Sequence, residues 1–236
     1  MSPRARFILI AGLLAFAAVS VRLGIWQLHR LAERRTANAA AAAARAAPEL
    51  DLAVRAGAAP AERRVRATGV YDRTHELVLR GRALRDVPGV AVVTPLRLAG
   101  SGDTAALVER GFLPVPDAVT LPPDSGALDE PGTRTVHGVA LPIPSASDSG
   151  APLDRAGRTT WARLDLAALR RRLPYPILDV YIQQTPDSAL PRLPRRREPP
   201  AVDDEGPHMN YALQWFGFAA TAVVFAGIFA TKGRVR

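Results

Sequence analysis

The feature that most constrains this chain is an apolar run near its C-terminal end, Pro207 to Thr231, which contains no acidic residue, lysine or arginine. A helix needs about 20 apolar residues to cross a bilayer, so this run is long enough for one span. Acidic residues precede it at 203–205, and basic residues follow it. Since positive charge is retained on the cytoplasmic side, the pattern predicts a membrane helix over 208–231 with a cytoplasmic tail, 232–236.

A second apolar run lies near the N-terminus. Residues 1–6 form a short basic tail, and Arg22 is the one charged residue within 7–28. A cleaved signal peptide has a similar outline, but this run is long and no small-residue cleavage site closes it. We therefore expect an uncleaved membrane helix with Trp26 at the interface. Two spans and a cytoplasmic C-terminus place residues 1–6 inside and 29–207 outside the cytoplasm.

The short basic tail leaves no room for a mitochondrial transit peptide, so the bacterial cytoplasmic (inner) membrane is the expected location. The net charge of +9 raises the question of nucleic-acid binding, but no nucleic-acid-binding motif accompanies it. Five of the charges flank the apolar runs, where they act as topology signals, so we expect the lipid bilayer and no nucleic acid as a partner. The absence of cysteine excludes disulfides and thiol chemistry.

The region between the two runs predicts a β domain with a core at about 62–186. Short β-like runs are separated by Gly, Pro and Asp, which favours a mainly antiparallel sandwich or partly open barrel with one short helix, capped by Asp165 and ending at Arg172. Before it, the Ala- and Arg-rich stretch 33–47 is either a solvated continuation of the first helix or a linker. The expected strands are 64–71, 76–80, 89–98, 105–109, 133–141, 158–162 and 177–185.

Catalytic motifs are missing from the sequence. There is no Gly-rich phosphate loop, no His-Glu-x-x-His and no Gly-x-Ser-x-Gly. Of the four histidines, His75 and His137 fall at the ends of expected strands, where an ordinary surface histidine is the simplest interpretation. We therefore do not expect an enzyme.

The two membrane helices carry a more informative pattern. At 100° per residue, Tyr211 and Trp215 share the face of His208, together with the alanines at 212, 219, 222 and 226. The face of Arg22 carries Trp26 and His29 towards the outside and the alanines at 11, 15 and 18 deeper in. Because small residues let helices approach closely in lipid, the two alanine stripes are expected to pack together.

Two interpretations of this pattern stay open. One is an aromatic belt on ordinary Ala-rich spans. The other is a slot at the outer membrane surface for a flat, apolar, anionic ligand. Neutral imidazole is a common axial ligand of haem iron, and Arg22, Arg30 or Arg34 would pair with carboxylates.

Several ordered motifs resemble those of the surfeit locus protein 1 family, over nearly the whole chain. The first is Leu23-Gly24-Ile25-Trp26-Gln27-Leu28-His29-Arg30-Leu31-Ala32-Glu33, and the closing one is Gly206-Pro207-His208-Met209-Asn210-Tyr211-Ala212-Leu213-Gln214-Trp215-Phe216. Between them stand Gly69-Val70-Tyr71-Asp72, Pro88-Gly89-Val90, Thr94-Pro95-Leu96 and the central Leu107-Val108-Glu109-Arg110-Gly111-Phe112-Leu113-Pro114. The chain departs from the family pattern at Glu109, where Asn or Asp is usual, at Phe112, often Trp, and at Arg34, often Lys.

The resemblance implies an assembly factor for haem–copper cytochrome c oxidase with two spans and an extracytoplasmic domain. It implies that the protein binds haem a and assists its delivery into oxidase subunit I, with haem a synthase as a further partner. The histidine of the closing motif, proposed in the family as the haem iron ligand, matches His208, whereas His29 falls at a variable position. The alternatives are a structural chaperone for subunit I that binds no haem, and a sensor domain between two spans, for which no cytoplasmic output domain is seen.

Overall fold

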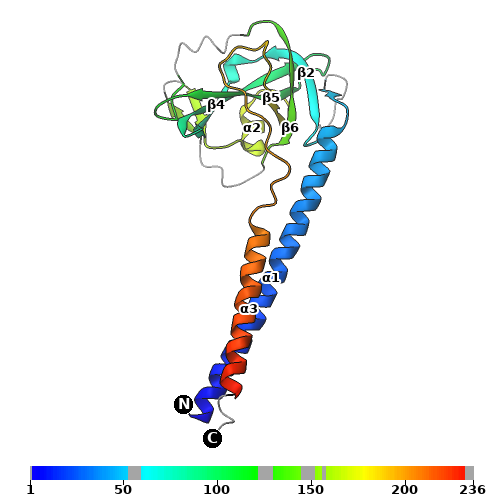
Figure 1. Ribbon diagram of the computed structural model, residues 1–236. Helices are drawn as coiled ribbons and strands as arrows, with labels where there is room; N and C mark the ends of the chain where they lie inside the picture. The colour runs from blue at the N-terminus through cyan, green and yellow to red at the C-terminus, as the bar shows by residue number, and fades with distance from the viewer. Residues whose placement is uncertain (1, 53–59, 122–129, 145–151, 156–157, 232–236) are drawn as a thin grey trace. The chain divides into compact units, whose positions relative to one another are not determined.

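The computed structural model consists of a pair of long helices and a β domain (Figure 1). It describes residues 2–52, 60–121, 130–144, 152–155 and 158–231. Contacts divide the chain into two compact units, one formed by 1–40 with 201–236 and the other by 41–200.

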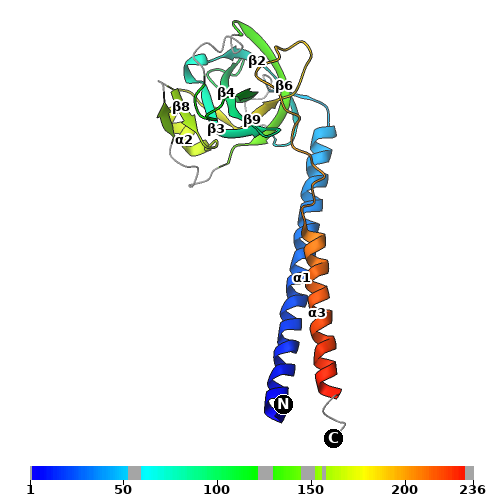
Figure 2. The ribbon, with the colours of Figure 1, turned by 60° about the vertical axis from the view of Figure 1, so that its left-hand side comes forward.

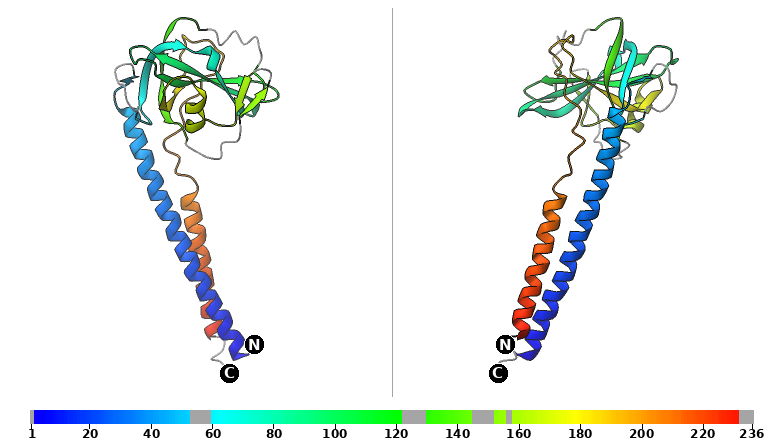
Figure 3. Two further views of the ribbon diagram at one scale, coloured as in Figure 1. Left: turned by 180° about the vertical axis from the view of Figure 1, so that it is seen from behind. Right: turned by 45° about the vertical axis from the view of Figure 1, so that its right-hand side comes forward.

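The helical unit contains α1 (Pro3–Ala46) and α3 (His208–Thr231). Both helices are long and apolar enough to cross a membrane. The expected continuation of the first helix through 33–46 is confirmed, and the linker alternative is wrong, because alanine is the strongest helix former. The helix ends at Ala46 because the residue before Pro48 disfavours helical geometry. The two helices run antiparallel and side by side in both views of Figure 3.

The contact between α1 and α3 follows a regular spacing on each helix. The buried residues recur at intervals of three and four on α1 and of seven, three and four on α3, a mean period of 3.5 that is typical of left-handed coiled-coil packing. We call these residues the seam: Ala17, Ser20, Gly24, Gln27 and Leu31 on α1, and Ala212, Ala219, Ala222 and Ala226 on α3.

The small residues of the seam bring the two backbones close together. Ala17, Ala219 and Ala222 form one buried cluster with Leu13 packed against it. A Cβ atom at Gly24 would lie 2.7 Å from the ring of Phe216, so no larger residue fits there without a shift. Close approach of this kind is how helices associate where no hydrophobic effect drives them together.

The predicted alanine stripe is confirmed on α3 and wrong on α1. The alanines at 212, 219, 222 and 226 are all buried, whereas those at 11, 15 and 18 are exposed. On α1 the buried face passes through Gly24 and Gln27, which lie about 200° and 140° from Arg22 on a helical wheel, on the opposite face of the helix. The prediction failed because it centred the face on Arg22, whereas the small residues that pack against α3 are Ala17, Ser20 and Gly24.

The β domain is a barrel. The strands β2 (Arg64–Tyr71), β6 (Thr133–Pro142), β9 (Ile177–Gln184), β5 (Ala105–Pro114) and β4 (Val87–Leu98) are neighbours in that order, and pairing of β2 with β4 closes the ring (Figure 2). All pairs in this ring are antiparallel except β5–β9. The expectation of a mainly antiparallel barrel is therefore confirmed in preference to the sandwich, although the β2–β4 pairing closes the ring that was expected to be partly open.

Further strands extend the sheet from both sides of the ring. β3 (Leu77–Leu84) pairs with β4, and β8 (Arg158–Trp161) and β7 (Leu153–Arg155) continue the sheet beyond it. β1 (Leu50–Asp51) runs parallel to β2. The sequence did not predict β1 and β7 because strands of two or three residues show no alternation of side chains.

Pro95 lies where β4 changes partners. Residues 87–93 pair with β3, and 96–98 pair with β2. A proline has no N–H to donate to a ladder, so it is tolerated at this crossing. The change of partner strand explains why a proline is found inside this strand.

Two hydrophobic cores cover the two faces of β5. Ala106 and Val108 belong to a cluster to which every strand of the ring contributes, and this cluster fills the barrel. Their neighbours Ala105 and Leu107 point the other way, as alternation requires, and pack in a second core with Trp161 and with the predicted helix, α2 (Leu166–Arg172). The Asp165 carboxylate accepts from the Ala168 N–H at 3.1 Å, so the predicted cap is confirmed.

Oxidative cross-linking tests the seam, because the chain has no native cysteine. We expect the pair Ala17→Cys/Ala219→Cys to form an intramolecular disulfide in membranes, since both residues are buried in one cluster. The control pair Ala18→Cys/Ala219→Cys should cross-link far less, because Ala18 is exposed. Equal yields from the two pairs would contradict the seam.

A glycine substitution should weaken the same cross-link. Gly24→Val is expected to lower its yield, because the added side chain meets the ring of Phe216. Gly12→Val is the matched control on the same helix, since its Cβ would meet nothing within 4 Å.

Candidate functional site

The closing motif places His208 at the first position of α3. Gly206 precedes it with φ of +67°, a left-handed conformation that favours glycine, and its N–H donates to the Asp204 carboxylate at 2.8 Å. The Tyr211 N–H donates to the Pro207 carbonyl at 3.1 Å, which starts the helix. The motif is thus a turn followed by a helix N-terminus.

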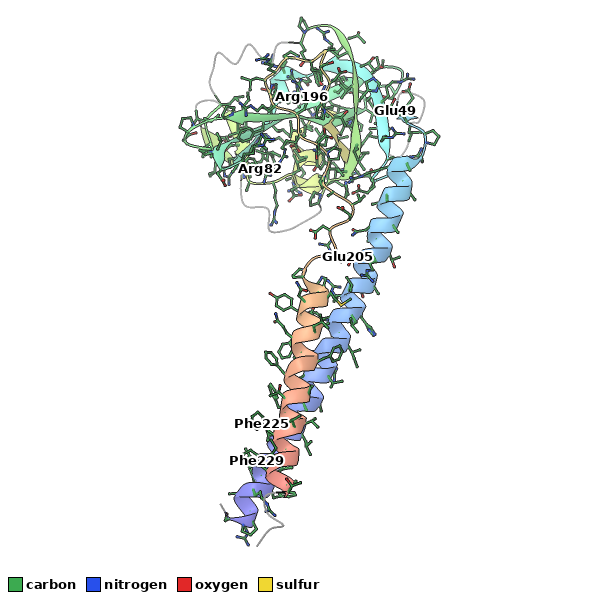
Figure 4. The ribbon with its side chains drawn as sticks, in the orientation of Figure 1. Glu49, Arg82, Arg196, Glu205, Phe225 and Phe229 are labelled. Atoms are coloured by element: carbon green, nitrogen blue, oxygen red, sulfur yellow. The ribbon has the colours of Figure 1, made fainter. Side chains whose placement is uncertain are left out.

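Two contacts fasten the chain before His208 to α1. The Arg35 guanidinium donates to both carboxylate oxygens of Glu205, at 2.7 and 2.9 Å, and the Asn38 amide donates to the Asp204 carbonyl at 3.1 Å. The hydrogen bond from Arg35 holds the pKa of Glu205, which Figure 4 labels, below its ordinary value. The Arg35–Glu205 pair is exposed, so solvent screens it and it fixes geometry more than it stabilises.

His208 makes its own contact with α1 through Gln27. Its Nδ1 lies 2.8 Å from the Gln27 side-chain oxygen, and Gln27 is only 9% exposed within the seam. An amide oxygen can only accept, so the His208 Nδ1 carries the hydrogen and donates it. The lone pair then lies on Nε2, the ring nitrogen that no described residue contacts by a hydrogen bond.

A hollow of about 340 Å³ lies beside His208 and is lined also by Arg30, Glu33, Arg34 and Ala37. Arg30 donates to Glu33 at 2.7 Å, but both side chains are more than half exposed, so this pair is weak. Arg34 has no ion pair among the described residues. The site therefore combines one imidazole with a free Nε2, two guanidinium groups and the Glu33 carboxylate, and the first two of these can bind an iron porphyrin with carboxylate substituents.

The predicted site residues lie on different parts of this surface. His208 and Arg30 line the same hollow, and the sequence had also named Arg34. Trp26 and Tyr211 are about half exposed on the helix surface, and Trp215 packs edge-on against Phe218, with ring centres 5.8 Å apart. Arg22 is exposed and is not part of the lining.

Gln27 was missed by the sequence analysis, although a signal for it exists. It is a polar residue inside an apolar span and part of the first motif. A polar side chain that is buried between two helices needs a hydrogen-bond partner, because an unpaired buried polar group costs free energy. The partner is the histidine of the closing motif, 181 positions away along the chain.

The central motif serves the barrel. The register between β4 and β5 shifts at Arg110, which is the extra residue of a β-bulge between Glu109 and Gly111. The sequence placed Arg110-Gly111 at a strand end; that prediction is wrong, because β5 continues to Pro114. A bulge interrupts the side-chain alternation, so the strand's continuation beyond Glu109 is not visible in the sequence pattern.

The bulge directs the Arg110 side chain into the domain, where it is fully buried. Its guanidinium contacts the Glu130 carboxylate at 2.7 Å and lies 4.6 Å from the ring centre of Tyr71. Arg196, labelled in Figure 4, donates to the same Glu130 oxygen at 3.3 Å. Burial raises the pKa of the Tyr71 hydroxyl to about 12, so the ring beneath the guanidinium stays neutral. A buried charge is tolerated only when it is paired in this way.

The residues around Arg110 hold the segment that leads from β9 towards α3. The backbones of Phe112 and Arg195 exchange two hydrogen bonds of 2.8 and 2.7 Å, and Glu109 accepts from Arg197. Gly111 has φ of +133°, and a Cβ atom there would lie 2.5 Å from the Arg195 carbonyl oxygen. Only glycine fits both conditions. The carboxylate of Glu109, where the family usually has Asn or Asp, is used directly in the contact.

His75 is also more than a surface histidine. It lies in the 3-10 turn η2 (Arg73–His75) and is two-thirds buried, and its Nδ1 is 2.7 Å from the Asp72 carboxylate. Asp72 also accepts from the Tyr175 hydroxyl at 2.8 Å and from the Thr74 N–H at 3.0 Å. Burial acts to raise the pKa of Asp72, but the hydrogen bonds from His75 and Tyr175 lower it below its ordinary value. The network caps the turn, which gives it a structural role. His137 lies within β6, where its Nδ1 is 3.0 Å from Glu49.

The architecture defines a class of protein with two apolar helices, one near each end of the chain, flanking a β-barrel domain. The model of the SURF1 family matches residues 14–220, and the chain belongs to that family. It is 27% identical to a SURF1-like protein of Monosiga brevicollis, over 94% of this chain and 87% of that protein. It is 26% identical to a SURF1-like protein of Rickettsia felis, over 89% of this chain and 92% of that protein. The family is known for cytochrome c oxidase assembly.

Replacement of Gly111 should damage the β domain. We expect Gly111→Val to lower the protease resistance of the domain in membrane preparations, because the side chain would collide with the Arg195 backbone and force an unfavourable φ. The control Gly102→Ala also has positive φ but open space around it, so it should cost only about 1–2 kcal/mol of stability. Protease resistance of Gly111→Val equal to that of the wild type would show that the contact with Arg195 is dispensable.

Proposed function

We propose that this protein is a membrane-anchored assembly factor for haem–copper cytochrome c oxidase that binds haem a through His208 and assists its delivery into subunit I. The observation that carries the proposal is the hydrogen bond of 2.8 Å between His208 Nδ1 and Gln27, which leaves Nε2 available beside a hollow lined by Arg30 and Arg34. Membership of the family supports the role in oxidase assembly.

Each part of the site has a task in this proposal. The haem a is the cargo, and its iron accepts the His208 Nε2 as an axial ligand. Its carboxylates pair with Arg30 and Arg34, while Arg22 stays a prediction that no contact supports. The hollow is at the small end of the range for ligand pockets, about 300–1,000 Å³, so it admits one edge of the ring rather than the whole.

The rest of the ring needs an apolar surface. Tyr211, Trp215 and Trp26 offer aromatic faces at this end of the helices. Burying the large apolar ring of the haem contributes several kcal/mol to the binding free energy, at about 25 cal/mol per Å² of buried surface. The bond to His208 therefore determines how the haem is oriented more than how tightly it is held. Such binding suits a carrier, which has to release its cargo.

The proposed setting is the bacterial cytoplasmic membrane. The protein crosses it at 7–28 and 208–231, with both termini in the cytoplasm and residues 29–207 outside. The partners are the lipid bilayer, subunit I and haem a synthase, and neither catalysis nor nucleic-acid binding is proposed.

A second candidate function is a structural chaperone for subunit I that binds no haem. It is favoured by a larger hollow of about 810 Å³ in the β domain, bordered by Arg85, Arg192 and Arg195 among others. An acidic segment of a partner protein fits such a surface. The absorption spectrum of the protein purified from cells that make haem a separates the two candidates.

Reporter fusions at Thr120 test the topology. We expect activity from an extracytoplasmic reporter alone, because the basic residues that follow the second span retain its C-terminal end inside. A cytoplasmic reporter that is active at this position would show that the orientation is reversed.

Replacement of His208 tests the ligand. We expect His208→Ala to remain folded and inserted in the membrane but to bind less haem a or to show a shifted Soret band, because the iron loses its axial nitrogen. His29→Ala is the matched control on α1, where His29 is exposed and does not line the hollow. Full haem content with an unshifted spectrum in His208→Ala would remove the axial role and favour the structural chaperone.

A further inference from the structure

We infer that Gln27 is a positioning residue for His208: its side-chain oxygen selects the ring tautomer and orientation in which Nε2 faces the ligand. The identity of the ligand rests on the proposed function, but the effect of Gln27 on the His208 ring does not depend on haem.

The position of Gln27 in the seam makes this contact specific. It is the one long polar side chain among the buried residues of α1, with Gly24 one turn before it and Leu31 one turn after it. The small residues of the seam hold α1 and α3 close enough for the two side chains to meet without an intervening water. Because Gln27 is only 9% exposed, few competing partners reach its side-chain oxygen, so the hydrogen bond is stronger than it would be in open water.

The hydrogen bond has consequences for the imidazole. Neutral histidine exists as two tautomers, and the partner of one nitrogen determines which nitrogen is left to bind a metal. Histidines that bind metals typically donate their other N–H to a carbonyl or carboxylate, which fixes the ring and raises the basicity of the ligand nitrogen. Gln27 has the position and the chemistry of such a partner.

A glutamine suits a carrier better than a glutamate would. A carboxylate at this place would be a charge in the apolar seam and would draw the Nδ1 proton more strongly, which makes the ring a stronger electron donor to iron. The neutral amide orients the ring with a weaker electronic effect. Gln27→Glu should therefore lower the reduction potential of bound haem a relative to the wild type, whereas Gln27→Leu should raise it.

The first experiment needs no haem. The full-length protein, labelled with ¹⁵N in its four histidines and placed in lipid nanodiscs, reports the tautomer of each ring by NMR, and His208→Ala assigns the signal. We expect His208 to carry its proton on Nδ1 in the wild type. In Gln27→Leu the tautomer ratio should shift towards Nε2–H by about five-fold, the effect of one ordinary hydrogen bond. Gln214→Leu, which changes an exposed glutamine of α3, should leave the ratio unchanged.

The outcomes separate this inference from the proposed function. A His208 protonated on Nε2 in the wild type, or a ratio that Gln27→Leu leaves unchanged, would overturn the positioning role. If the tautomer behaves as expected but His208→Ala does not alter haem a binding, the contact stands and the haem ligand is another residue. If His208→Ala alters the spectrum while Gln27→Leu and Gln27→Glu leave the reduction potential at the wild-type value, the electronic role of Gln27 is wrong.

Discussion

The close packing of α1 against α3 is the constraint on which the candidate site depends. Its seam is lined by small residues, of which Gly24 leaves room for the ring of Phe216, since a Cβ atom there would lie 2.7 Å from the ring unless the ring shifted. This approach brings Gln27 to within hydrogen-bond distance of His208. The first and the closing motif of the family therefore meet as one structural unit, and a larger residue in the seam would separate them.

The central motif of the β domain differs from the helix contact, because it buries a charged side chain instead of small residues. The bulge in β5 places Arg110 between Glu130 and the ring of Tyr71, and the same stretch pairs with the backbone of Arg195. Such an arrangement stabilises through pairing rather than through apolar packing, so it tolerates loss of a partner badly. The motif thus explains how the strand and the segment after β9 are fixed to each other.

Sequence reasoning predicted most of this architecture where local signals exist. Alternation and turn residues located the ring strands and the cap at Asp165, and hydropathy located both apolar helices. It failed where the signal is non-local. The bulge at Arg110 disrupts alternation, the closure of the ring depends on β2 meeting β4, and the α1 face of the seam is recognisable only from its partner. Gln27 shows the same limit, since its importance lies in a contact with a residue at the other end of the chain.

The most direct test of the central claim is the distance from bound haem a to labels placed at single cysteines, which the cysteine-free chain allows. A nitroxide at Ala37, which lines the hollow beside His208, should relax strongly through the iron. A nitroxide at Ala11 should relax much less, because it lies about 24 Å along α1 from Gln27 at a rise of 1.5 Å per residue. Equal relaxation at the two positions, or stronger relaxation at Ala11 than at Ala37, would contradict a haem site at His208.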